Sequence, residues 1–157
     1  MSISLKRKLE ADIEIRATAA DVHYEICSGK PHNISHAAPH FIQAVDLHEG
    51  DHGKVGSKCA WKYTLGGKPL VVKSVLEEID EEKKLVKYRA IEGDMLDEYK
   101  TFCGTCQVIP KDEKNCIVKY IFEYEKLHSG VPEPTAWLDA WLAATIDMDD
   151  HHHGIKK

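Results

Sequence analysis

Strict alternation of apolar and polar side chains marks the start of the chain. In residues 6–17, KRKLEADIEIRA, one side receives Leu9, Ala11, Ile13 and Ile15, and charged side chains fill the other. A period of two predicts a long strand with one buried face. Six further runs of strand type follow it, at residues 41–47, 57–65, 69–80, 84–93, 96–109 and 116–126.

Two short helices are expected between the first and second strands. Thr18 and Asp21 have the spacing of a capping box, with Asp in place of the usual Glu or Gln. Gly29 interrupts this first helix. A second short helix is predicted over residues 31–38, because the following Pro39 disfavours a helical conformation in the residue before it.

A long amphipathic helix is predicted after Gly130. The segment VPEPTAWLDAWLAATIDMDDHH has no glycine, has proline near its start and is rich in Ala and Leu. Spacings of i, i+3 and i+4 give this segment one broad apolar stripe along the helix. The stripe is formed by Trp137, Leu138, Trp141, Leu142, Ala144, Thr145 and Met148. Short, turn-rich links between the strands indicate an antiparallel meander. We therefore expect one α+β domain over residues 1–157, with a curved seven-stranded sheet wrapped around this helix.

The alternation also predicts which side chains such a sheet would enclose. The inward sets are Cys59, Trp61, Tyr63 and Leu65; Val72, Ser74 and Leu76; Val86, Tyr88 and Ala90; Phe102, Gly104, Cys106 and Val108; and Val118, Tyr120, Phe122 and Tyr124. Buried phenols need hydrogen-bond partners or water, and small residues in a strand leave room for something to approach. Each tyrosine alone is typical of an ordinary core, but the set favours a hydrated or ligand-filled cavity.

Composition and charge narrow the classes of function. The 157 residues are 43% hydrophobic and 30% charged, with a formal net charge of −5. A mildly acidic chain lacks the basic face that nucleic-acid binding requires. No run approaches the length of a membrane span, and the first residues lack the apolar core of a secretory signal. Together with an odd number of scattered cysteines, this predicts a cytoplasmic protein with reduced thiols, without nucleic acid or membrane insertion.

The segment HEGDHGKVGS, residues 48–57, brings Gly50, Gly53 and Gly56 together with one lysine. A phosphate-binding loop needs GK followed by Ser or Thr, and a helix whose amides face the phosphate. Here Lys54 is followed by Val55, and a strand follows the loop. The three glycines are instead predicted to supply backbone angles closed to other residues, in the turn between the second and third strands. We expect no cofactor.

Metal and redox chemistry are weakly indicated. Cys103 and Cys106 form a C-x-x-C motif, but inside a predicted strand residues three apart face opposite sides. Adjacent helical residues point about 100° apart, so the histidines at 151–153 cannot all bind one ion from a helix. His48 and His52 flank the glycine-rich loop and offer at most a weak surface site. The prediction is that no metal is bound.

These features together resemble the plant major latex proteins, a branch of the birch-pollen allergen (Bet v 1-like) superfamily. The resemblance spans about Leu5 to His153 and is most specific in DLHEGDHGKVGS, in EEIDEEKKLVKYRAIEGDMLDEYKTF, and in FEYEKL followed by PEP and the final helix. It implies a helix-grip fold with a large interior cavity for amphipathic small molecules, such as sterols, cytokinins or flavonoids. It also implies an association with defence and stress responses. We expect a monomer whose partner is a small hydrophobic or amphipathic molecule.

The resemblance places Ile26, Ile42, Val86, Tyr88 and Phe102 along the cavity, with Gly104 and the inward face of the last helix. Combined with the alternation, the predicted ligand-binding set is Ile26, Ile42, Trp61, Tyr63, Ser74, Val86, Tyr88, Phe102, Gly104, Tyr120, Leu138, Trp141, Leu142 and Thr145. Two departures from the family pattern affect its shape. Gly104 and Cys106 are small where relatives are often bulkier, and Trp137 and Trp141 are unusually large. The cavity is therefore expected to be widened at one end and narrowed at the other.

An enzyme is the alternative, because a few relatives in alkaloid pathways have become catalysts. An isomerase or cyclase would need a titratable group inside the pocket, and the inward sets contain tyrosines but few charges. Lys100, placed near Phe102 on one alternation face, is the lysine to check, and Asp139 and Asp147 qualify only if their helix turns them inward. We predict binding without catalysis and assign no catalytic residue. A module that binds another protein when loaded remains a third alternative.

Overall fold

The sheet has the predicted seven strands within the part of the chain that the structure describes. The structure is a computed structural model that describes residues 5–16 and 20–155, with side chains to residue 151. The strands are β1 (Lys6–Arg16), β2 (Ile42–Glu49), β3 (Lys58–Leu65), β4 (Lys68–Asp80), β5 (Leu85–Gly93), β6 (Tyr99–Pro110) and β7 (Asn115–Lys126). Every neighbouring pair is antiparallel, in the order β1-β7-β6-β5-β4-β3-β2. The predicted α+β fold class is confirmed.

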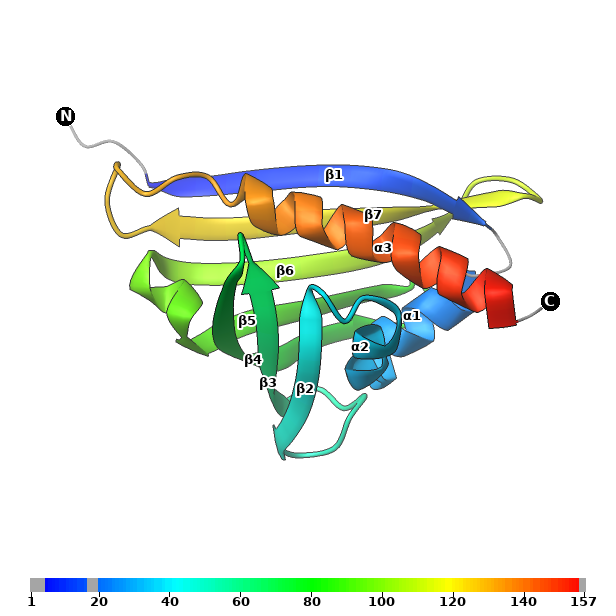
Figure 1. Cartoon of the computed structure of the whole chain (residues 1–157), viewed down its shortest axis with the longest axis horizontal. Coiled ribbons are helices and arrows are strands. Elements are labelled where there is room, and N and C mark those ends of the chain that lie inside the picture. The colour runs from blue at the N-terminus through cyan, green and yellow to red at the C-terminus, as the bar shows by residue number, and fades with distance from the viewer. Residues whose placement is uncertain (1–4, 17–19, 156–157) are drawn as a thin grey trace.

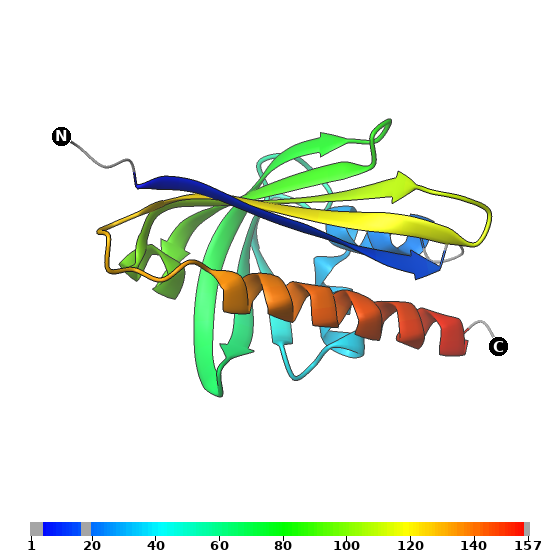
Figure 2. The ribbon, with the colours of Figure 1, turned by 90° about the horizontal axis from the view of Figure 1, so that it is seen from above.

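The two short helices after the first strand and the long C-terminal helix lie where the sequence pattern predicted them, and a further 3-10 helix forms at residues 94–97, where none was predicted. They are α1 (Ala20–Gly29), the 3-10 helix η2 (Pro31–Asn33), α2 (Ile34–Ala37), the 3-10 helix η3 (Asp94–Asp97) and α3 (Thr135–Ile155). In Figure 1, α3 runs along the concave side of the sheet, and α1 and α2 lie together near one end of it. Figure 2 shows α3 as a separate layer beside the curved sheet. Thr18, the expected cap of the first helix, is outside the described residues.

Irregularities in strand pairing bend the sheet around α3. β1 and β7 keep one register from Lys6 opposite Glu125 to Arg16 opposite Asn115. The β2–β3 and β4–β5 pairs each contain two register shifts, and the β6–β7 pair contains one. Such bulges bend a strand and increase its twist. As a result, β2, β3 and β4 lie across the direction of β1 and β7 (Figure 1), and the concave face can enclose a space.

The sixth strand begins later than the sequence predicted, and this changes one assignment. Residues 94–97 form η3, so β6 starts at Tyr99 rather than at 96. A register shift between Tyr99 and Thr101 then interrupts the alternation. Tyr99 and Phe102 are both buried, although they are three residues apart, and Lys100 is exposed. The prediction that Lys100 shares the inward face of Phe102 is therefore wrong, because a bulge breaks the period of two.

The glycine-rich loop between β2 and β3 has the backbone that the sequence predicted. Gly50, Gly53 and Gly56 have φ angles of 77°, 81° and 95°, in the left-handed region that favours glycine. A Cβ at Gly53 would lie 3.3 Å from the Cα of Gly29 at the end of α1, so this loop packs closely against that helix. Among the described residues, none of the helices has both the length and the apolar character needed to cross a bilayer.

Candidate ligand-binding site

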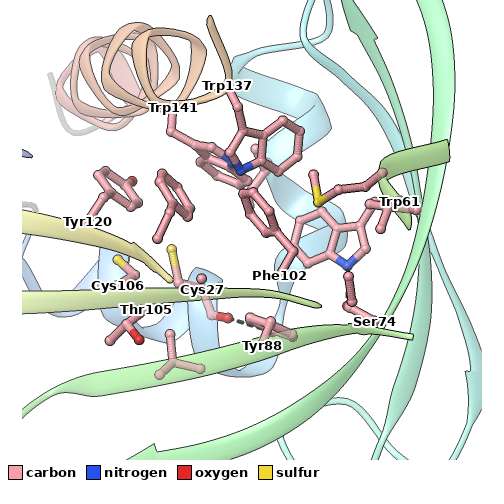
Figure 3. A pocket seen from close by; sticks show the side chains of 17 residues that line it. Cys27, Trp61, Ser74, Tyr88, Phe102, Thr105, Cys106, Tyr120, Trp137 and Trp141 are labelled. Atoms are coloured by element: carbon pink, nitrogen blue, oxygen red, sulfur yellow. Dashed lines mark hydrogen bonds between the residues drawn. The ribbon is translucent and has the colours of Figure 1, made fainter. Parts of the chain in front are cut away.

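A cavity of about 90 Å³ lies between the concave face of the sheet and α3 (Figure 3). Its walls come from α1, α2, α3, η3 and strands β3 to β7. The lining residues are Cys27, Ile34, Trp61, Val72, Ser74, Val86, Tyr88, Ala90, Met95, Phe102, Gly104, Thr105, Cys106, Tyr120, Phe122, Trp137 and Trp141. Pockets for drug-sized ligands have volumes of about 300–1,000 Å³. The space is thus much smaller than the large cavity that the family resemblance implied.

Two tryptophans of α3 account for much of this narrowness. Trp137 and Trp141 are four residues apart, so they project from one face of the helix, and their ring centroids lie 5.9 Å apart. Trp137 packs edge-on against Tyr63 and Phe41, with centroids at 4.9 and 5.5 Å. Trp141 approaches Tyr120 on β7 at 5.8 Å. The indoles fill the space between helix and sheet, in agreement with the expected narrowing at this end.

The expected widening at Gly104 is absent. Gly104 on β6 pairs with Phe122 on β7, and a Cβ at position 104 would lie 3.0 Å from the ring of Phe122. The aromatic ring therefore occupies the volume that the missing side chain leaves. The prediction of extra room at this end is wrong, because alternation identifies a small residue but not a neighbouring ring that covers it.

The protein satisfies several polar groups of the cavity wall by itself. Nε1 of Trp61 donates a 2.8 Å hydrogen bond to Oγ of Ser74. The hydroxyl of Tyr88 donates one of 2.8 Å to the carbonyl of Cys27, drawn as a dashed line in Figure 3. The hydroxyl of Tyr124, outside the cavity, donates to the carboxylate of Glu133. These tyrosines do not need a ligand or water as their partner, contrary to the expectation from the sequence.

Tyr120 also has its partner within the protein. Its hydroxyl lies 2.5 Å from Oγ1 of Thr145. Thr145 donates its own proton to the carbonyl of Trp141 at 2.8 Å, so Tyr120 donates to Thr145. This chain of hydrogen bonds ties β7 to α3 behind the cavity wall.

The indole of Trp137 is the exception among these polar groups. Only 8% of Trp137 is exposed. Among the residues that the structure describes, no hydrogen-bond partner is found for its Nε1 atom. A buried N–H without an acceptor costs about 1–3 kcal/mol. Trp137 is one of the residues that line the cavity, so one donor of a lining residue is left without a partner in the described part of the chain.

A second polar group of side chains, His23, Cys27 and Cys106, lies at the α1 side of the cavity. Nε2 of His23 lies 3.6 Å from Sγ of Cys27 and 3.8 Å from Sγ of Cys106. The hydroxyl oxygen of Tyr120 lies 3.4 Å from the same nitrogen. His23 is only 1% exposed. The C-x-x-C partner Cys103 is not part of this group; burial, and next the charge of Glu77, raise the pKa of its thiol.

Mutual contacts shift the pKa values of this group. The hydrogen bond from Cys106, and next the neighbouring His23, hold the pKa of the Cys27 thiol well below its usual range despite burial. The same hydrogen bond and burial raise the pKa of Cys106. Burial opposes protonation of His23, but its contact with Cys27 and the charge of Asp149 raise its pKa. The hydrogen bond between the two thiols thus shifts their pKa values in opposite directions.

The predicted ligand-binding residues divide into two groups. Those that line the cavity are Trp61, Ser74, Val86, Tyr88, Phe102, Gly104, Tyr120 and Trp141. Those outside its lining are Ile26, Ile42, Tyr63, Leu138, Leu142 and Thr145. Ile26 and Ile42 are buried in the core. The ring of Tyr63 packs against the indole of Trp137, and Oγ1 of Thr145 is hydrogen-bonded to the hydroxyl of Tyr120. The glycine-rich loop does not line the cavity either.

The charged candidates for catalysis lie outside the cavity. The side chain of Lys100 is 68% exposed, and its Nζ lies 3.7 Å from a carboxylate oxygen of Glu125. Asp139 is exposed, and a carboxylate oxygen of Asp147 lies 3.4 Å from Nε2 of His40. None of the three is among the lining residues.

Sequence reasoning did not name several lining residues as ligand contacts. Val72, Ala90, Cys106 and Phe122 were predicted to face inward, and Trp137 belongs to the predicted apolar stripe of the last helix. Cys27, Ile34 and Met95 were missed because they lie on short helical segments, where too few turns define an inward face. The available signal for Cys27 was its position next to Ile26, about 100° further around the same helix.

Known proteins with similar sequences cover almost the whole chain. Residues 4–153 match the model of the pathogenesis-related protein Bet v 1 family. MLP-like protein 31 of Arabidopsis thaliana is 44% identical over 151 residues, which are 96% of this chain and 88% of that protein. MLP-like protein 43 of the same plant is 41% identical over 149 residues, or 94% of each chain.

Solved structures with the same fold include close and distant relatives. Ginseng major latex-like protein 151 from Panax ginseng superposes with a TM-score of 0.90 at 36% identity, covering 94% of this chain and 98% of that chain. Norcoclaurine synthase from Thalictrum flavum, in complex with dopamine and hydroxybenzaldehyde, has a TM-score of 0.74 at 21% identity, covering 98% of this chain and 90% of that chain. The second likeness concerns the fold alone. By family model, sequence and fold, the chain belongs to the Bet v 1 family, in its major latex protein branch.

Proposed function

We propose that this protein binds an amphipathic, mainly apolar small molecule in the cavity beneath α3. The observation that supports this most directly is the unpaired Nε1–H of Trp137, a residue that lines this mainly apolar cavity. A ligand with one acceptor atom, such as a carbonyl, ether or ring nitrogen, would satisfy this donor. The rest of the molecule would face apolar side chains.

Burial of apolar surface would supply most of the binding free energy, at about 25 cal/mol per Å² removed from water. The cavity volume of about 90 Å³ limits the size of the ligand in this conformation. A cavity of about 150 Å³ in another protein holds benzene. The cavity here is smaller than that one, so even a compact ring system would require the indoles of Trp137 and Trp141 to shift, and a sterol or flavonoid would require a larger movement.

Binding is favoured over catalysis because the charged side chains proposed for an enzyme point away from the cavity. A protein that holds a metabolite without converting it would act as a carrier or buffer, in the defence and stress responses that the family resemblance implies.

Calorimetric titration with two ligands of the same shape tests the proposal. Quinoline has a ring nitrogen as acceptor and naphthalene does not. Removing the donor in Trp137→Phe should reduce the ratio of quinoline to naphthalene affinity by about 2- to 10-fold, because one hydrogen bond contributes about 0.5–1.5 kcal/mol. Naphthalene serves as the control for changes in cavity shape. If Trp137→Phe leaves the ratio of quinoline to naphthalene affinity unchanged, the indole N–H does not bind the acceptor atom of the ligand.

A broader panel tests whether the cavity binds metabolites at all. Cytokinins, flavonoids, sterols and a fluorescent apolar probe should be titrated into the parent chain. The proposal predicts saturable binding of the more compact members. If neither bicyclic compound nor any member of the panel binds with a Kd below about 100 μM, equivalent to about −5.5 kcal/mol, the proposed function fails.

A further inference from the structure

Two thiols and one imidazole converge at the inner side of the cavity, from segments far apart in sequence. His23 and Cys27 are four residues apart on α1, so they lie on one face of that helix. Cys106 comes from β6. The three side-chain atoms all lie within 4.8 Å of one another. Figure 3 shows Cys27 and Cys106 side by side, close to Tyr120. All three residues are buried.

The two sulfur-to-nitrogen distances match edges of a tetrahedral metal site. With Zn–S bonds of about 2.3 Å and Zn–N bonds of about 2.0–2.1 Å, tetrahedral geometry separates sulfur from nitrogen by about 3.6 Å. The observed separations from Nε2 of His23 are 3.6 Å to Cys27 and 3.8 Å to Cys106. We propose that His23, Cys27 and Cys106 bind one zinc ion. Zinc binding here would not require the proposed small-molecule function, although Cys27 and Cys106 line the same cavity.

Donor type and charge favour zinc. Thiolate and imidazole are the ligands that zinc prefers in proteins, and soft thiolates exclude calcium and magnesium. Two thiolates neutralise a divalent ion, whereas a monovalent copper ion would leave one net negative charge in an apolar interior. Burial of an uncompensated charge is costly. Zinc binds thiolate sulfur and neutral imidazole nitrogen, so binding would release protons from these groups.

Three protein ligands leave a fourth position. Sites with three ligands keep this position open for water or another oxygen donor. The hydroxyl of Tyr120 lies 3.4 Å from Nε2 of His23, and Cys27, Cys106 and Tyr120 all line the cavity. The fourth position would therefore be accessible from the cavity, next to the phenol of Tyr120.

Metal titration of the chelator-treated, reduced full chain tests the site. Cobalt(II) should produce a thiolate-to-metal charge-transfer band that saturates at one equivalent, and zinc should abolish it. The variants Cys27→Ser, Cys106→Ser and His23→Gln should each bind zinc at least about 100-fold more weakly. The control Cys59→Ser removes a buried thiol that contacts a different histidine, His52, and should leave zinc affinity unchanged. If Cys59→Ser weakens zinc binding as much as the three ligand variants do, the assignment of the site is contradicted.

X-ray absorption at the zinc edge of the unaltered chain gives a test that does not depend on whether variants fold. The site predicts two sulfur neighbours at about 2.3 Å and nitrogen at about 2.0–2.1 Å. A triple variant, His151→Gln with His152→Gln and His153→Gln, removes the histidines near the C-terminus as competing ligands and should preserve this spectrum. A spectrum without sulfur neighbours, or the absence of a charge-transfer band with cobalt, would overturn the proposal.

Discussion

The ring of Phe122 covers Gly104 across the β6–β7 pair, where a Cβ at position 104 would come within 3.0 Å of it. Both residues line the cavity. This contact explains why a glycine on the inward face of a strand does not enlarge the cavity. It also links strand packing directly to the space available for a ligand.

Replacing the glycine should therefore reduce ligand binding. In Gly104→Ala the new methyl group would push the ring of Phe122 into the cavity. We expect quinoline affinity to fall several-fold and the free energy of unfolding to fall by about 1–3 kcal/mol, as for other overpacked cores. Calorimetry and urea unfolding measure the two effects. The double variant Gly104→Ala with Phe122→Leu should recover affinity, and failure to recover it would contradict this account of the contact.

Tyr88 should stabilise the packing of α1 against the sheet. Its hydroxyl donates a 2.8 Å hydrogen bond to the carbonyl of Cys27. Tyr88→Phe keeps the ring but leaves that carbonyl without this donor, so we expect a loss of about 1–2 kcal/mol in the free energy of unfolding. Hydrogen exchange should also be faster for amides of α1. Unchanged stability and exchange would show that water replaces the hydroxyl at no cost.

Gly93, at the end of β5, should tolerate no side chain. It has a φ of 113°, and a Cβ would lie 2.4 Å from the carbonyl oxygen of Val71. Backbone strain alone costs about 1–3 kcal/mol, and the clash adds to it, so Gly93→Ala should destabilise the fold by more than about 2 kcal/mol in urea unfolding. The matched control is Gly67→Ala. Gly67 has a φ of 78° with open space around it. Gly67→Ala should therefore lower the free energy of unfolding only by the cost of backbone strain.

Buried tyrosines should make the fold sensitive to alkaline pH. Burial, and then nearby acidic side chains, raise the pKa of Tyr63 and of Tyr99 to about 12. In the unfolded chain both would titrate near pH 10. Between these values the unfolded state binds fewer protons than the folded state, so the free energy of unfolding falls as pH rises.

Urea unfolding at a series of pH values from about 9 to 11 measures this slope around the unfolded tyrosine pKa. Tyr63→Phe should make the dependence of the free energy of unfolding on pH shallower, because it removes one of the titrating phenols. A slope that is identical in the parent and in Tyr63→Phe would show that Tyr63 titrates normally in the folded protein.

Much of the fold could be predicted from the sequence because the strands are long and their inward faces are regular. In β7, Val118, Tyr120, Phe122 and Tyr124 alternate without interruption, and all four are buried as predicted. The prediction failed where the backbone leaves this period. The bulge after Tyr99 put Lys100 on the outside.

The candidate site was only partly predictable for a related reason. Trp61 on β3 and Tyr88 on β5 follow the alternation of their strands, which placed them correctly toward the interior. Cys27 could not be distinguished from Ile26 on a short helix with few turns. Its proximity to Cys106 depends on how α1 packs against the sheet, a tertiary relationship that no local pattern contains. The unpaired state of the Trp137 indole likewise depends on its neighbours in space.

The central claim is that a small molecule binds at Trp137, and the indole N–H resonances of the three tryptophans test it most directly. Nitrogen-15 spectra recorded during quinoline titration should show a saturable shift of the Trp137 signal, assigned by its absence in Trp137→Phe. The Trp61 indole already donates to Ser74, so its signal should move less. If quinoline and the metabolite panel leave the Trp137 resonance unmoved at saturating concentration, the cavity does not bind ligands in the way proposed.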